Sequence, residues 1–162
     1  FIPATALTYP VYNLVNRLHL YDTRSALILI YSCSGIAVSF FVIKNYYDNI
    51  PRELVEAARI DGCGYVQTWV KVIFPIARPG IMTAAVLAFL NNWNEYYWAS
   101  LVLITREKLT VPALLSTFTT AFNTNYNGLF SAMVIIILPP VLLYCIFSRF
   151  FIEALSGGAV KG

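Results

Sequence analysis

The chain alternates between long apolar runs and short polar segments, and the runs have the length of membrane helices. Residues 25–43, 79–105 and 129–148 are apolar over about the 20 residues that an α-helix needs to cross the hydrocarbon core of a bilayer. One acid, Glu95, interrupts the second run, and Pro139–Pro140 should bend or loosen the third near its middle. The pattern predicts an all-α integral membrane protein.

The segments outside these runs extend the prediction. Residues 1–16 carry no charge but contain Pro3 and Pro10, which is typical of a truncated or kinked membrane helix and gives about four membrane helices in all. Because the chain starts inside an apolar run, we expect it to be the C-terminal part of a longer polypeptide, with residues 1–162 forming one transmembrane domain. Residues 109–128 read as a short interfacial helix followed by a turn ending at Gly128.

Composition agrees with a membrane protein and excludes several classes of function. Hydrophobic residues make up 59% of the chain and charged residues only 12%, against roughly 25% charged in soluble domains. The net charge of +3 is scattered, which argues against a nucleic-acid partner. A lone His19 and three widely spaced cysteines (Cys33, Cys63 and Cys145) offer no metal-ligand spacing and no catalytic set.

The basic residues predict how the chain lies across the membrane. Seven of them flank one side of the predicted spans and four the other, and the side richer in Lys and Arg is normally cytoplasmic. We therefore expect the polar segment 44–78 and the C-terminus in the cytoplasm. The two groups are Lys44, Arg52, Arg59, Lys71, Arg78, Arg149 and Lys161, and Arg17, Arg24, Arg106 and Lys108.

The polar segment 44–78 has the pattern of two short helices joined by a glycine turn. Pro51 suits the first turn of a helix, Glu53 then lies near the positive end of its dipole, and Gly62 suits the left-handed position where a helix stops. Apolar spacing predicts a second helix that ends at Pro75. Its stripe consists of Val66, Trp69, Val70 and Ile73.

Two small residues, Ala57 and Ala58, follow Glu56 on the first of these helices. Small side chains let another surface approach the backbone, and Glu56 can accept a charge-assisted bond from an Arg or Lys of a partner. The alternative is intramolecular: Glu56 pairs with Arg52 or Arg59, and the alanines pack on the protein's own helices.

At this segment the sequence resembles the EAA loop of the permease subunits of ABC importers. Glu-Ala-Ala, three residues, Gly, nine residues and an apolar pair ending in Pro are matched by Glu56, Ala57, Ala58, Gly62 and Pro75, with Val72 and Phe74 in place of the commoner Ile and Leu. Three further stretches resemble the carbohydrate-uptake, maltose-type branch of that family. They are "LYDTRSALIL", "NNWNEYYWASLVL" and "LSGGAVKG".

The resemblance implies the ABC importer permease fold, with the last part of a six-helix bundle here and residues 44–78 as a cytoplasmic coupling loop. In that family a coupling helix docks in a groove of an ATP-hydrolysing subunit. The residues that would carry the coupling are Arg52, Glu53, Glu56, Ala57, Ala58, Asp61 and Gly62.

The same resemblance implies the partners and the location. The chain has no phosphate-binding GxxxxGK[ST] loop, so ATP and Mg²⁺ would bind a partner subunit, and this chain would be non-catalytic and without a cofactor. We expect a second permease subunit that forms a heterodimer, rather than a homodimer, with this chain, together with two ATP-binding subunits and an extracellular or periplasmic solute-binding protein. The location would be a bacterial or archaeal cell (inner) membrane, with several spans in contact with lipid.

The C-terminal tail, residues 154–162, has two interpretations. It is either a free end or a segment inserted between the ATPase subunits, as in one class of sugar importers. The contacts would then be Ser156, Gly157, Gly158 and Lys161.

A polar cluster inside the second run is a candidate for the solute pathway. Glu95 would lie about 24 Å along a helix entering at Pro79, and charges at such depth usually face a cavity or a partner. Alternatively, these residues bond to neighbouring helices, cap a broken helix end or contact the binding protein. The cluster consists of Asn91, Asn92, Trp93, Asn94 and Glu95.

The sequence leaves three functions open. The first is a permease subunit of an ABC importer for a sugar or oligosaccharide. The second is a permease of the same branch for glycerol phosphate or another polyol. The third, from a different class, is a stand-alone channel or carrier, which predicts ionisable pairs buried in several helices, whereas only Glu95 qualifies here.

Overall fold

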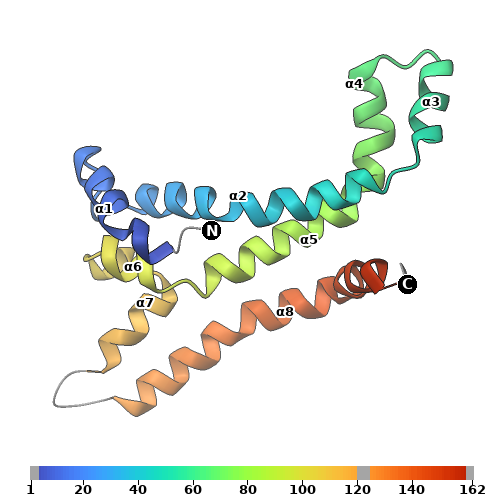
Figure 1. Ribbon diagram of the computed structural model, residues 1–162. Helices are drawn as coiled ribbons and strands as arrows, with labels where there is room; N and C mark the ends of the chain where they lie inside the picture. Colours follow the sequence, from blue (N-terminus) through green and yellow to red (C-terminus); the bar gives the residue numbers. More distant parts are fainter. Residues whose placement is uncertain (1–3, 120–124, 160–162) are drawn as a thin grey trace. The chain divides into compact units, whose positions relative to one another are not determined.

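The computed structural model describes residues 4–119 and 125–159, with side chains at 5–119 and 125–148, and its regular elements are helices. Four of them carry most of the described chain: α2 (Arg24–Asp48), α3 (Arg52–Ile60), α5 (Phe74–Trp93) and α8 (Tyr126–Ala159). The shorter elements are η1 (Ala4–Leu7), α1 (Thr8–Arg17), α4 (Tyr65–Thr68), η2 (Trp69–Ile73), α6 (Tyr97–Val102), η3 (Arg106–Lys108), α7 (Val111–Leu115) and η4 (Ser116–Phe118). Figure 1 shows their order along the chain.

Three helices in the described part of the chain are long and apolar enough to cross a membrane. They are Arg24–Asp48, Tyr65–Trp93 and Tyr126–Ser148. The all-α membrane fold is therefore confirmed, with three spans in place of about four. The predicted first span forms η1 and α1, and the ten residues of α1 make a helix only about 15 Å long.

The second span differs from its prediction at both ends. Residues 65–93 are helical without interruption, because the π-helical turn η2 joins α4 to α5, so the helix does not end at Pro75. A π turn shifts the hydrogen-bond pattern by one residue, which lets a helix continue past a site where the regular pattern fails. At the other end α5 stops at Trp93 and does not reach Thr105.

The two prolines of the last span lie inside an unbroken helix, since α8 includes both Pro139 and Pro140. Proline is tolerated in membrane helices where local adjustments satisfy the freed backbone groups. Before α8, residues 111–118 form α7 and η4, in agreement with the expected short helix, and Thr110 caps α7 by accepting from the Ala113 N–H at 3.4 Å. α8 begins two residues before Gly128, within the predicted turn.

The chain divides into two compact units, and each spanning helix contributes to both. Unit 1 comprises residues 1–34 and 91–140, and unit 2 comprises residues 35–90 and 141–162. Unit 1 contains the apolar core: Ala26 and Leu27 of α2 lie in one buried cluster with Trp98, Ala99 and Val102 of α6.

In unit 2 a glycine permits close packing between α5 and α2. A Cβ added at Gly80 would overlap the ring of Tyr46 and lie 2.8 Å from the Tyr46 Cβ. The root of the tyrosine side chain has little freedom to move away, so Gly80 has to remain a glycine for this contact.

We therefore predict that Gly80→Ala destabilises the protein by about 1–3 kcal/mol, the usual cost of overpacking. Gly35, also within a helix, is the matched control, because a Cβ there meets nothing within 4 Å. Gly35→Ala should leave stability unchanged or raise it by up to about 1 kcal/mol through helix propensity. Unfolding in detergent micelles measures both, and equal stabilities for the two variants would contradict the packing argument.

Candidate functional site

The predicted coupling segment folds as a tight helical hairpin in unit 2. α3 and α4 lie side by side (Figure 1), joined by the turn around Gly62. Gly62 has φ +79°, the left-handed conformation that its position after the helix requires. The turn closes when the Gly62 N–H donates to the Arg59 carbonyl at 3.0 Å and the Cys63 N–H donates to the Ala58 carbonyl at 2.9 Å. Glu53 in the first turn and the glycine stop are as predicted, whereas Pro51 precedes the helix as its N-cap residue and does not lie in its first turn.

The two alanines of the hairpin do not share one environment. Ala58 is buried inside the protein, whereas Ala57 and Glu56 are exposed. The i, i+1 positions point about 100° apart around a helix, so a single face cannot present both equally. The expectation that both alanines form a docking surface is therefore restricted to Ala57.

Glu56 has no ion pair with Arg52 or Arg59 among the described side chains, although helical spacing allowed either. Arg52, Arg59 and Asp61 are exposed as well. The intramolecular alternative thus holds for Ala58 and finds no support at Glu56.

The hairpin also exposes large apolar side chains that the sequence interpretation did not assign to the site. Ile60 is 86% exposed and Tyr65 85%, on either side of the glycine turn. Val66 and Val70 of the predicted apolar stripe are also exposed. Such a concentration of exposed apolar residues beside charges is typical of an interaction surface. In the sequence, the position of Ile60 and Tyr65 close to the turn at Gly62 was the feature that could have indicated their exposure.

The solute-pathway candidates lie at the break between α5 and α6, in unit 1. The prediction that Glu95 lies within a spanning helix is wrong, because α5 ends at Trp93, two residues before it. Its carboxylate accepts from the Trp98 N–H at 2.8 Å and the Ala99 N–H at 3.2 Å, and the Tyr31 hydroxyl donates to it at 2.7 Å. This matches the alternative that the cluster caps a broken helix end.

The neighbouring polar residues have different surroundings. The Trp93 Nε1–H donates to the Ile136 carbonyl of α8 at 3.0 Å. The Asn92 Oδ1 is buried and has no hydrogen-bond partner among the residues that the structure describes, and Asn91 and Asn94 are exposed. The five candidates therefore do not act as one polar cluster, because Trp93 and Glu95 each use a polar group to bind the protein's own backbone.

Asp22, in the stretch "LYDTRSALIL", accepts more hydrogen bonds than any other carboxylate in the described part of the chain. It has φ +55°, and its side chain accepts from the Ile104 N–H at 2.9 Å and the Thr105 N–H at 3.0 Å. The Thr105 hydroxyl (2.5 Å) and the Lys108 ammonium (2.8 Å) also donate to it.

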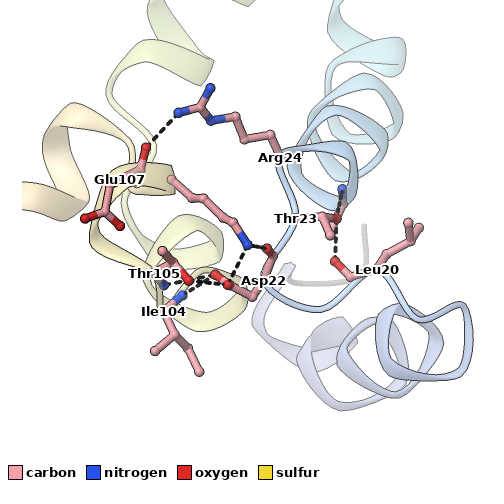
Figure 2. A network of polar contacts seen from close by, with 9 residues as sticks. Leu20, Asp22, Thr23, Arg24, Ile104, Thr105 and Glu107 are labelled. Atoms are coloured by element: carbon pink, nitrogen blue, oxygen red, sulfur yellow. Dashed lines mark hydrogen bonds and ion pairs between the residues drawn. The ribbon is translucent and has the colours of Figure 1, made fainter.

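Figure 2 shows this network between the start of α2 and the segment that follows α6. Beside it, the Arg24 guanidinium donates to the Glu107 carbonyl at 2.7 Å. The Lys108 ammonium, followed by the bonds from Thr105 and Ile104, holds the pKa of the Asp22 carboxyl well below its usual range. The resemblance of this stretch to the carbohydrate-uptake branch did not by itself assign a role to Asp22.

Comparison with known proteins then decides the family. A family model described as a binding-protein-dependent transport system inner membrane component matches residues 2–157. The chain belongs to this family. The predicted ABC importer permease of the carbohydrate-uptake branch is confirmed, and with it a non-catalytic membrane component that binds no cofactor itself.

Relatives of this permease are named for sugar transport. It is 38% identical to the arabinooligosaccharides transport system permease protein AraQ of Halalkalibacterium halodurans, over 99% of this chain and 57% of that protein. It is 32% identical to the trehalose transport system permease protein SugB of Mycobacterium tuberculosis, over 99% of this chain and 59% of that one. The permease chain thus spans a little over half the length of these relatives.

A solved structure supports the fold. The permease matches a chain in the crystal structure of a bacterial ABC transporter involved in the import of the acidic polysaccharide alginate. The TM-score is 0.72 at 25% identity, and the match covers 89% of this chain and 56% of that one.

The bonding of Asp22 predicts a specific pH dependence of stability. Because the pKa of its carboxyl is lower in the folded protein than the unfolded value of about 3.9, its contribution is complete above that value and disappears as pH falls through the folded pKa. The unfolding temperatures of the wild type and Asp22→Asn should differ by a constant amount from about pH 8 to about pH 5, and the difference should shrink progressively as the pH falls below about 4 toward the folded pKa. Convergence already near pH 6 would contradict the assignment.

Proposed function

We propose that this chain is a membrane-spanning subunit of an ATP-driven importer for a sugar or oligosaccharide, and that the α3–α4 hairpin couples it to a separate ATPase subunit. The single observation that carries the coupling proposal is the geometry of the hairpin. It presents Glu56, Ala57, Ile60 and Tyr65 to the surface around a left-handed glycine turn. The relatives' names, arabinooligosaccharide and trehalose transport, support the sugar class.

The hairpin is mechanically continuous with two spans. Asp48, the last residue of α2, precedes the start of α3 at Arg52 by a short link. On the other side, α4 passes through η2 into α5 as one helix over residues 65–93. A force on α4 is thus delivered to a spanning helix without passing through a loop.

The charged residues of the hairpin have distinct roles in this proposal. Glu56 accepts a charge-assisted bond from a cation of the ATPase, and Ala57 lets that surface approach the backbone. Arg52 and Glu53 stand at the start of α3, and Asp61 precedes the turn at Gly62. Ala58 supports the hairpin from inside.

The assembly follows from the same proposal. We propose a second permease subunit, two ATP-binding subunits and a solute-binding protein as partners. The family description names a binding-protein-dependent transport system. ATP and Mg²⁺ belong to the partner subunits.

The tail and the polar cluster enter as further parts of this proposal. α8 continues as a helix through Ser156, Gly157 and Gly158, which can carry the tail contacts to the ATPase, and Lys161 lies outside the described residues. For solute contact, Asn91 and Asn92 are the better candidates of the cluster, because Trp93 and Glu95 bind the protein's own backbone.

The second candidate is an importer for an anionic glycoside within the same branch. It is favoured by the similarity to the sulfoquinovosyl glycerol transport system permease protein SmoH of Agrobacterium fabrum, which is 31% identical over 99% of this chain. Stimulation of ATP hydrolysis in the reconstituted assembly by neutral oligosaccharides would favour the first candidate. Stimulation by acidic oligosaccharides alone would favour the second.

The coupling role predicts that Glu56→Arg and Ala57→Trp each abolish co-purification of the ATPase subunit and lower uptake at least about tenfold, as for hot-spot residues. Glu107→Arg is the matched control, because Glu107 is an equally exposed acid in unit 1 and the described contacts use only its backbone carbonyl. ATPase binding that survives both hairpin substitutions, or that is lost equally in the control, would show that the coupling assignment is wrong.

The proposed orientation, with the hairpin and the C-terminus in the cytoplasm, is supported by how the basic residues divide. Lys44, Arg52, Arg59, Lys71 and Arg78 lie in unit 2, whereas the four basic residues assigned to the opposite side lie in unit 1.

A membrane-impermeant maleimide tests this orientation in whole cells. In a background lacking native cysteines, it should label Arg106→Cys in intact cells and label Gln67→Cys only after lysis, since both positions are exposed. The reverse pattern would place the hairpin outside and exclude ATPase coupling.

A further inference from the structure

Two carboxylates hold the two ends of α6, the short helix after the break in the second span. At its beginning, Glu95 accepts from the Trp98 and Ala99 N–H groups. Just beyond its end, Asp22 accepts from the Ile104 and Thr105 N–H groups. The first N–H groups of a helix and those of a connecting segment have no helical partner, and in a membrane environment they must find one.

Each carboxylate also connects α6 to α2. Tyr31 is the eighth residue of α2, and its hydroxyl donates to Glu95 at 2.7 Å. Asp22 stands two residues before α2 begins, and its own N–H donates to the Val102 carbonyl at 3.0 Å. The two elements are thus joined at two separate places along α6.

The surface between these two attachments is closely packed. Ala99 and Val102 are fully buried and Trp98 is 9% exposed, in one cluster with Ala26 and Leu27 of α2. A dense apolar contact resists sliding, and the polar bonds at both ends fix its register. These features lie within unit 1.

We propose that Asp22 and Glu95 are positioning residues that lock α6 to the adjoining part of α2, so that the two move as one rigid body during transport. The proposal rests on the proposed function for the existence of an ATP-driven cycle. It implies that α6 is not a separate gate: any opening of the pathway at this end requires movement of the α2–α6 body as a whole.

The chemistry explains why carboxylates, and not amides, occupy these positions. The donors around Glu95 are two N–H groups and one hydroxyl, and those around Asp22 are two N–H groups, a hydroxyl and an ammonium. A carboxylate accepts at both oxygens, whereas an amide turns one of them into a donor that faces another donor. The isosteric variants Asp22→Asn and Glu95→Gln therefore break the lock without changing side-chain volume.

The decisive experiment measures the distance between α2 and α6 during the cycle. Spin labels are placed at Ser25→Cys and Ser100→Cys, both exposed, in a background with Cys33, Cys63 and Cys145 replaced by serine. The full transporter with its ATPase is reconstituted in liposomes, and electron paramagnetic resonance compares the nucleotide-free and vanadate-trapped states. We expect the same distance distribution in both. A shift of about 5 Å or more, one helical turn, would overturn the proposal.

The isosteric variants supply a second readout that a purely structural role would not move. Asp22→Asn and Glu95→Gln should broaden the distance distribution and lower uptake by about tenfold per ATP hydrolysed, with ATPase binding retained. Asp48→Asn is the control, because it removes an exposed pair with Lys44 on α2 of little energetic value. Unchanged uptake per ATP and an unchanged distribution in both variants would also overturn the proposal.

The outcome separates this inference from the proposed function. If no ATPase binds or no ATP-dependent uptake occurs in the wild-type assembly, the proposed function fails. If uptake proceeds and the labels move apart, the importer stands and the lock fails. If either variant does not fold, the distance measurement on the spin-labelled protein with Asp22 and Glu95 intact still decides whether α2 and α6 move together.

Discussion

The absence of water in the bilayer core dominates this structure, because every backbone N–H and C=O in it must find a partner within the protein. The three long helices satisfy this requirement internally. Where a helix stops, side chains have to supply the missing acceptors. Glu95 does so at the start of α6, and Asp22 does so after its end. Two acids of unit 1, Asp22 and Glu95, are therefore found at interruptions of the helical pattern.

The same constraint explains the difference between the two ends of the second span. At Trp93 the helix breaks, and polar side chains and a buried apolar cluster stabilise the new direction. At Pro75 the helix does not break, because a π turn absorbs the irregularity. At the Trp93 end the chain changes direction at a break that hydrogen bonds stabilise. At the Pro75 end the helix runs without a break from α4 of the hairpin into α5. This asymmetry is consistent with the proposed coupling, in which the hairpin receives the force.

The hairpin combines rigidity with exposure. Its glycine turn and the internal packing of Ala58 fix the angle between α3 and α4, so the exposed groups are presented in a defined arrangement. An interaction surface of this type gains affinity because little conformational entropy is lost on binding. The apolar residues Ile60 and Tyr65 would contribute buried area, and Glu56 a directed bond.

Much of this protein was determined by local sequence. The run of apolar residues at 25–43 fixed a membrane helix, because no other structure hides its backbone in lipid, and Gly62 fixed the left-handed turn, because other residues are strained there. Only the tertiary structure decided which alanine is exposed, that the helix continues past Pro75, and that Glu95 caps α6. The side chains that join Glu95 and Asp22 to other parts of the protein also come from residues far along the chain, such as Tyr31 for Glu95 and Thr105 and Lys108 for Asp22. Sequence spacing cannot place such partners, because it describes neighbours along a helix and not contacts made when distant segments pack.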